Sequence, residues 1–192
     1  MKMGASRLII VCGVPGLGKS TLALRVAERW EGVRFASETF AEELGTTART
    51  ASGDLSKEAI AHAYDAMGVA VGNALLINKL VVAVGSFRSV EQRKRFRDIA
   101  AHAGAAVNTV RIVCPVETAA KRILSRRALG ERGPTETAIG QIDAELNRAS
   151  DIEMVLTNDS SVQDFHRRID ALIQALGWGT NDDTSTPVVM QE

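Results

Sequence analysis

The sequence has few cysteines, no long apolar run and no excess of charge of either sign. Its two cysteines, Cys12 and Cys114, belong to no C-x-x-C or Cys/His pattern, which argues against a disulfide scaffold and favours two reduced, buried thiols. A membrane-spanning helix needs about 18 or more consecutive apolar residues, and no such run occurs. Because residues 1–7 lead directly into a strand pattern, we expect a soluble cytoplasmic protein.

Positive and negative charges balance, with 23 lysines and arginines against 23 aspartates and glutamates. No overall field therefore steers the protein towards nucleic acid or an anionic membrane. One basic cluster remains, and it consists of Arg88, Arg93, Lys94, Arg95 and Arg97. A run of this kind is usually a solvated helix face, although it could also bind an anionic substrate such as nucleic acid.

Strand and helix patterns alternate along the 192 residues, which are enough for one α/β domain with a sizeable core. Apolar runs predict strands at residues 8–12, 33–36, 80–84, 107–114 and 154–156. Helices are predicted at residues 19–30, 38–44, from 54 or 56 to 75, 89–104, 116–127, 135–150 and 161–177. This alternation predicts a five-stranded parallel sheet with helices on both faces and ligands at the carboxyl ends of the strands. Residues 179–192 are polar and without period, so we expect a disordered tail.

A glycine-rich stretch joins the first strand pattern to the first helical pattern. It matches G-x-x-x-x-G-K-[ST] and consists of Gly13, Val14, Pro15, Gly16, Leu17, Gly18, Lys19, Ser20 and Thr21. Such glycines let backbone N–H groups converge on a polyphosphate, and the helix N-terminus adds unpaired donors and partial positive charge. Lys19 is expected to reach the β- and γ-phosphates, and the Ser20 hydroxyl to bind Mg²⁺. We call residues 13–21 the phosphate cradle.

A GTPase switch is the first rival hypothesis, and it requires D-x-x-G after one strand and N-K-x-D after another. Asp65 and Gly68 match the first motif only inside a predicted helix, and residues 78–81 lack the final aspartate of the second. The sequence therefore excludes a GTPase of this type.

With the cradle in this context, the chain resembles P-loop kinases of adenylate-kinase-like topology. It is most similar to the small phosphotransferases that include chloramphenicol phosphotransferase, polynucleotide 5′-hydroxyl kinase and the zeta toxins. The similarity covers residues 8–176 and rests, outside the cradle, on residues 37–44, 86–93, 122–126 and 156–159. The resemblance implies strand order 2-3-1-4-5, a kinase domain at residues 1–178, a small helical lid at about 122–140, and the use of ATP with Mg²⁺.

The resemblance also implies roles for four residues outside the cradle. Glu38, after the second strand, occupies the place of the carboxylate that accepts the proton of the substrate hydroxyl; the alternative is a carboxylate that complements a helix dipole. Arg122 and Arg126 share a helix face, which suits two guanidinium groups on phosphoryl oxygens, although solvated arginines are the alternative. Asn158 is expected either to line the adenine pocket or to be a turn residue.

Two positions depart from the pattern of this family. Ala41 stands where an arginine often follows the carboxylate, and Val84 stands where the third strand usually ends in an aspartate that orients water on the metal. Losing such a partner typically costs about 10–100-fold in metal affinity or activity. The two departures leave open weak activity, an altered metal site, or nucleotide binding without catalysis.

The preferred hypothesis is an ATP-dependent kinase that transfers the γ-phosphate to a hydroxyl of a small molecule, with a nucleoside-like compound or an antibiotic as candidates. The alternatives are a polynucleotide 5′-hydroxyl kinase and a nucleotide-binding protein with little or no catalysis. The catalytic residues would be Lys19, Glu38, Arg122 and Arg126.

Overall fold

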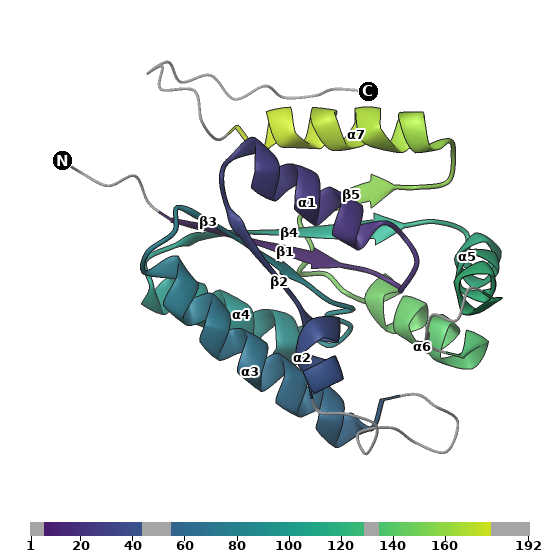
Figure 1. Ribbon diagram of the computed structural model, residues 1–192, viewed down its shortest axis with the longest axis horizontal. Helices are drawn as coiled ribbons and strands as arrows, with labels where there is room; N and C mark the ends of the chain where they lie inside the picture. Colours follow the sequence, from purple (N-terminus) through teal and green to yellow (C-terminus); the bar gives the residue numbers. More distant parts are fainter. Residues whose placement is uncertain (1–5, 44–54, 129–134, 178–192) are drawn as a thin grey trace.

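A computed structural model of the chain describes residues 6–43, 55–128 and 135–177. Its centre is a parallel sheet of five strands, as the sequence pattern predicted (Figure 1). The strand order is β2-β3-β1-β4-β5, as the resemblance implied. The strands are β1 (Arg7–Cys12), β2 (Val33–Ala36), β3 (Leu80–Val84), β4 (Ala106–Val113) and β5 (Met154–Thr157).

The central strands are apolar along their length because helices cover both faces of the sheet. Every residue of β3 is buried, as is every residue of β1 except Arg7. The register places Val11 beside Val84 on one side and Cys12 beside Arg111 on the other. Strands β1, β3 and β4 therefore all end at the carboxyl edge of the sheet, where β4 reaches two residues beyond the end of β1.

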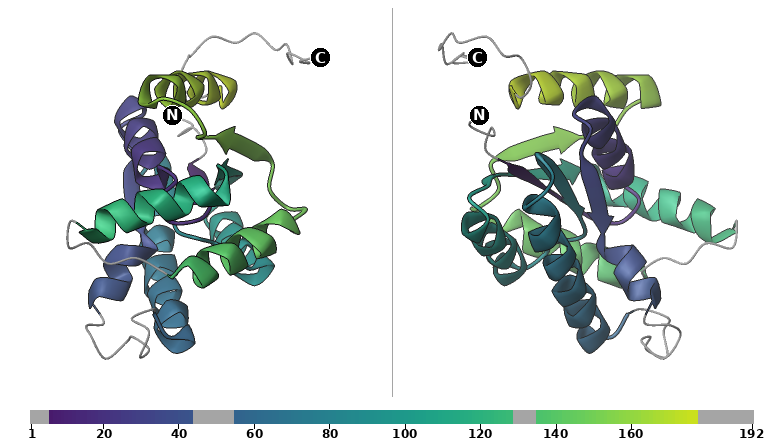
Figure 2. Two further views of the ribbon diagram at one scale, coloured as in Figure 1. Left: turned by 90° about the vertical axis from the view of Figure 1, so that its right-hand side faces the viewer. Right: turned by 60° about the vertical axis from the view of Figure 1, so that its left-hand side comes forward.

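Helices α1 and α7 lie on one face of the sheet and α3 and α4 on the other, and Figure 2 shows the same layers from two further directions. Helices α2, α5 and α6 lie at the end of the sheet towards which the strands run (Figure 1). The bounds are α1 (Lys19–Arg29), α2 (Ser37–Glu43), α3 (Lys57–Leu75), α4 (Val90–His102), α5 (Val116–Ala128), α6 (Glu136–Asn147) and α7 (Val162–Ala175).

Hydroxyl side chains begin four of these helices by accepting hydrogen bonds from the first turn. Ser56, rather than Asp54, is the cap of α3, and its Oγ accepts from the Ala59 N–H at 3.1 Å. The predicted capping box of α4 is confirmed, since Ser89 and Gln92 each accept a backbone N–H of the other. The caps of α6 and α7 are Thr135 and Ser161.

Some predicted boundaries are displaced. Strand β4 begins and ends one residue earlier than predicted, so Cys114 lies beyond the strand and is only half-buried, contrary to expectation. Cys12 is fully buried as predicted, and burial raises the pKa of its thiol to about 11. Helix α6 ends at Asn147 and not at residue 150, and Arg148 is its C-cap.

Several expectations concern residues outside the described ranges. These are the residues before Ser6, the end of the second expected helix at residue 44, residues 129–134 of the expected lid, and the expected tail at 179–192. Among the residues that the structure does describe, no helix has the length and apolar character needed to cross a membrane.

Candidate functional site: a phosphate cradle at the carboxyl edge of the sheet

The cradle lies between the end of β1 and the start of α1, and two of its glycines are required by close contacts. Gly13 has φ +143°, and a Cβ there would lie 2.7 Å from the Ile112 carbonyl oxygen on β4. Gly18 has φ +90°, and a Cβ would lie 2.7 Å from Phe165 Cε1 on α7. Any larger residue would displace the backbone of the cradle, because these neighbours belong to the packed core.

The N-terminus of α1 is built to receive an anion. Its N-cap, Gly18, makes no side-chain capping bond, and the first turn carries no acidic residue. The first backbone N–H groups of a helix have no intrahelical partner and carry partial positive charge. A helix N-terminus of this kind suits an anion such as a phosphate group.

Lys19 and Ser20 begin the helix at this point. Lys19 is only 6% exposed, and its Nζ donates to the Val14 carbonyl oxygen at 3.0 Å across the cradle. Ser20 is exposed, so its hydroxyl is accessible for a magnesium ion. Within the described ranges, no group of three or more His, Cys, Asp or Glu side chains forms a separate metal site.

Asn158 directly follows β5 and supports the cradle with its side chain. Its side chain is 7% exposed, and its Nδ2 donates to the Leu17 carbonyl oxygen at 2.8 Å. The backbone carbonyl oxygen of Asn158 accepts from Arg122 Nη1 of α5 at 3.3 Å. The structure therefore brings Arg122 and Asn158 together against the cradle, while the side chain of Arg126 lies outside the described part of α5.

Glu38 lies in the first turn of α2, directly after β2, and is exposed at the carboxyl edge of the sheet. The positions that depart from the family pattern are apolar and enclosed: Ala41 is 4% exposed and Val84 is 5% exposed. Val84 ends β3 beside Val11, next to the cradle. An apolar side chain there supplies no hydrogen-bond acceptor next to the cradle.

Three hydroxyl groups beside the cradle were not identified from the sequence. Tyr64, predicted as core, is indeed 5% exposed, but its hydroxyl lies 3.3 Å from Ser86 Oγ and accepts from the Phe87 N–H at 2.8 Å. Ser37 also hydrogen-bonds the Tyr64 hydroxyl, and a Cβ on Gly85 would be 3.0 Å from its Oγ. The available signal was the single tyrosine of the chain on the sheet-facing side of a helix.

A hollow of about 360 Å³ opens between α3 and α4 next to Tyr64, within the size range of small-molecule sites. Its floor includes the apolar side chains of Ile60, Ala61 and Phe96. Charged and polar side chains complete the lining, namely Lys57, Asp65, Arg88, Ser89, Glu91, Gln92 and Arg95.

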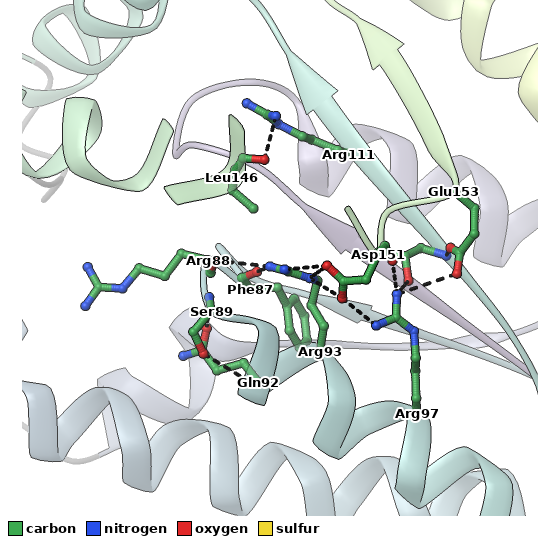
Figure 3. A network of polar contacts seen from close by, with 11 residues as sticks. Phe87, Arg88, Ser89, Gln92, Arg93, Arg97, Arg111, Leu146, Asp151 and Glu153 are labelled. Atoms are coloured by element: carbon green, nitrogen blue, oxygen red, sulfur yellow. Dashed lines mark hydrogen bonds and ion pairs between the residues drawn. The ribbon is translucent and has the colours of Figure 1, made fainter. Parts of the chain in front are cut away.

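The predicted basic cluster is not a free cationic surface. Arg93 is 2% exposed and holds Asp151 through two of its nitrogens, and Arg97 binds the other side of the same carboxylate (Figure 3). The remaining cations of the cluster also have carboxylate partners, in the pairs Arg88 with Glu145, Lys94 with Asp98 and Arg95 with Asp65. The interpretation of this cluster as a nucleic-acid surface therefore has no support from its geometry.

The comparison with protein families matches residues 8–150 to the family described as AAA domain. No curated relative matches the chain.

Solved structures share the fold at low identity. A gluconokinase from Sinorhizobium meliloti 1021 is 17% identical, with 91% of this chain and 95% of that chain covered and a TM-score of 0.67. The Mycobacterium tuberculosis APS kinase CysC in complex with AMPPNP and APS is 18% identical, covering 88% and 99% at a TM-score of 0.60. Chaetomium thermophilum Kti12 in complex with ADP-AlF3 is 19% identical, covering 87% and 97% at a TM-score of 0.60. Since the family match covers more than half of the chain, the protein belongs to the AAA domain family, and it has the fold of small P-loop kinases.

Proposed function

We propose that the protein is a kinase that transfers the γ-phosphate of ATP to a hydroxyl of a small molecule. The observation that carries the proposal is the cradle, in which an uncapped, acid-free helix N-terminus meets the buried amine of Lys19. The shared fold supports it, since one solved structure is a gluconokinase and another is an APS kinase in complex with AMPPNP and APS.

In the proposed reaction the oxygen of the acceptor hydroxyl forms a bond to the γ-phosphorus. The bond from the γ-phosphorus to the β–γ bridging oxygen breaks, and ADP leaves. Glu38 accepts the proton of the hydroxyl, while Lys19 and the guanidinium groups of Arg122 and Arg126 hold the phosphoryl oxygens. Magnesium on the Ser20 hydroxyl would neutralise the charge on the phosphates.

The test of this function is transfer of labelled γ-phosphate from ATP, with Mg²⁺, to pooled acceptors. The pools contain nucleosides, nucleoside and aminoglycoside antibiotics, sugars, and 5′-hydroxyl oligonucleotides. Label on one small-molecule pool is the expected result. Label on oligonucleotides alone would favour the polynucleotide kinase alternative, and saturable ATP binding without transfer would favour a nucleotide-binding protein, the alternative that the apolar Val84 and Ala41 motivate.

Replacement of Glu38 by glutamine is expected to lower the transfer rate by roughly 10²-fold, because glutamine keeps the shape of the side chain but accepts no proton. Glu42→Gln is the matched control, since Glu42 is an exposed carboxylate on the same short helix and is not expected to alter the rate. Single-turnover rates at saturating ATP measure the effect. Equal rates for Glu38→Gln and wild type would remove Glu38 from the base role and leave it as a helix-dipole carboxylate.

We further propose that the body of the acceptor lies in the hollow between α3 and α4. Ala61→Trp is expected to fill the hollow and raise the KM for the acceptor about 10-fold with kcat little changed, which is the signature of lost binding. Ala66→Trp is the control, because Ala66 is exposed on the same helix and does not line the hollow. Steady-state kinetics with the acceptor that the transfer assay identifies measure the two KM values. Equal KM values for the two variants would place the acceptor elsewhere.

A further inference from the structure

The turn that joins β3 to α4 contains a strained residue. Phe87 has φ +45°, in the left-handed region that bulky side chains rarely occupy, and its side chain is fully buried. A conformation of this kind persists only where neighbouring contacts hold it, and such residues are concentrated at functional sites. This turn lies at the carboxyl edge of the sheet, next to the cradle.

Two hydrogen bonds and two ring contacts hold Phe87. Its N–H donates to the Tyr64 hydroxyl at 2.8 Å, and its carbonyl oxygen accepts from Arg93 Nη1 at 2.6 Å. Its ring packs edge-to-face on Tyr64 and on Phe96, with ring centroids 5.0 Å and 4.9 Å away. Of these contacts, only the Tyr64 hydroxyl is a single group that can be removed without changing the packing.

The same turn is bonded to the cradle. The N–H of Gly85 donates to the Val11 carbonyl oxygen at 3.1 Å, and the N–H of Gly13, the first residue of the cradle, donates to the Ser86 carbonyl oxygen at 3.3 Å. The turn thus continues the pairing of β3 with β1 beyond the strands. A shift of residues 85–87 would withdraw the carbonyl group on which the cradle begins.

The Tyr64 phenol suits this task chemically. Burial raises its pKa above the ordinary value of 10.0, so the group stays protonated at physiological pH. It therefore accepts the N–H of Phe87 and keeps a proton for one of the two hydroxyl groups beside it, that of Ser86 at 3.3 Å or that of Ser37. Gly85 provides the space, since a Cβ there would lie 2.5 Å from the phenol oxygen.

We propose that Tyr64 is a positioning residue of the nucleotide site: its hydroxyl holds the turn at residues 85–87 so that the Ser86 carbonyl group anchors Gly13 of the cradle. The inference rests on the proposed function only in taking the cradle to bind ATP. It assigns a role in nucleotide binding to a helix, α3, that contributes no residue to the cradle.

Tyr64→Phe keeps the ring and removes the hydroxyl. It is expected to weaken ATP binding about 10-fold, because a buried N–H loses its partner and the turn relaxes. Amide exchange at Gly13 and Phe87 should quicken by a similar factor. Gly85→Ala is the second variant, since its Cβ would displace the phenol oxygen while Tyr64 remains, and it should give the same result.

Val71→Ala is the control for a merely structural effect, because Val71 is a fully buried apolar residue on the same helix. It should lower stability without changing ATP affinity or the exchange of Gly13. Unchanged ATP affinity and unchanged Gly13 exchange in both Tyr64→Phe and Gly85→Ala would overturn the proposal. These readouts need no acceptor, so the positioning role can fail while phosphate transfer is confirmed. It can equally hold when no acceptor is phosphorylated, whereas a wild-type protein that binds no ATP would overturn it.

Discussion

Lys19→Ala is expected to lower phosphate transfer by about 10³-fold or more, the largest effect of any single substitution proposed for this protein. The amine of Lys19 is enclosed at the start of α1 and reaches across the cradle to the Val14 carbonyl oxygen. In such an enclosed place a fixed positive charge interacts with phosphoryl oxygens far more strongly than it would in water. Alanine leaves the helix intact because it is the strongest helix former.

The measurement is single-turnover transfer of labelled γ-phosphate, together with thermal unfolding of the variant. Lys94→Ala is the matched control, since Lys94 is exposed and paired with Asp98 one helical turn away. That variant should transfer phosphate at the wild-type rate. Retention of more than about a tenth of the rate in folded Lys19→Ala would show that the cradle does not stabilise the transferring phosphate as proposed.

Arg93→Met should lower the free energy of unfolding by about 3 kcal/mol, because removing one partner of a buried ion pair leaves the other groups uncompensated. The guanidinium of Arg93 donates both to Asp151 and to the carbonyl oxygens of Phe87 and Arg88. It therefore ties α4 to the segment before β5 and to the turn after β3 (Figure 3). Arg97→Met removes the second donor to the Asp151 carboxylate together with the hydrogen bond to Thr109 and the ion pair with Glu153. Because Arg97 is about a quarter exposed, a smaller loss of about 1 kcal/mol is expected.

Urea unfolding of the two variants and the wild type at neutral pH measures these differences. Its pH dependence gives a second check on the same network. Hydrogen bonds from Arg93 hold the pKa of the Asp151 carboxyl at about 2, below its ordinary value of 3.8. Below about pH 4 the unfolded chain binds this proton before the folded one, so wild-type stability should fall between about pH 4 and about pH 2.

In Arg93→Met that part of the acid dependence should shrink, since the carboxyl loses its principal hydrogen-bond donor. An unchanged free energy of unfolding in Arg93→Met would mean that the network contributes nothing net to stability. If the free energy of unfolding of the variant fell with pH as steeply as that of the wild type, other carboxylates would be the cause of the acid sensitivity.

Features set by local sequence were predicted well. The cradle depends on residues at fixed offsets between one strand and one helix, and its backbone follows the expected pattern. The apolar runs of β1 and β3 predicted buried strands because a doubly covered parallel strand has no polar face. The sheet order came from the resemblance to P-loop kinases, and no local pattern in the chain contains it.

Features that depend on distant partners were missed. Arg93 was part of a charge run that usually indicates a solvated face, but Asp151, 58 residues later, and the carbonyl group of Phe87 enclose it. The hydroxyl of Tyr64 meets Phe87 across 23 residues, and a spacing rule for helices predicts only that the ring is buried. In both cases the missing information was which polar group the fold brings to a buried side chain.

The two outer strands of the sheet, β2 and β5, have four residues each, whereas β4 between them has eight. The inner strands are rich in the β-branched apolar residues that favour intermolecular pairing when exposed. Short outer strands leave little backbone on which another chain could add a strand, which is a common protection against edge-to-edge aggregation. The strand order that places β1, β3 and β4 at the centre of the sheet therefore also keeps the strands that are most prone to intermolecular pairing away from its edges.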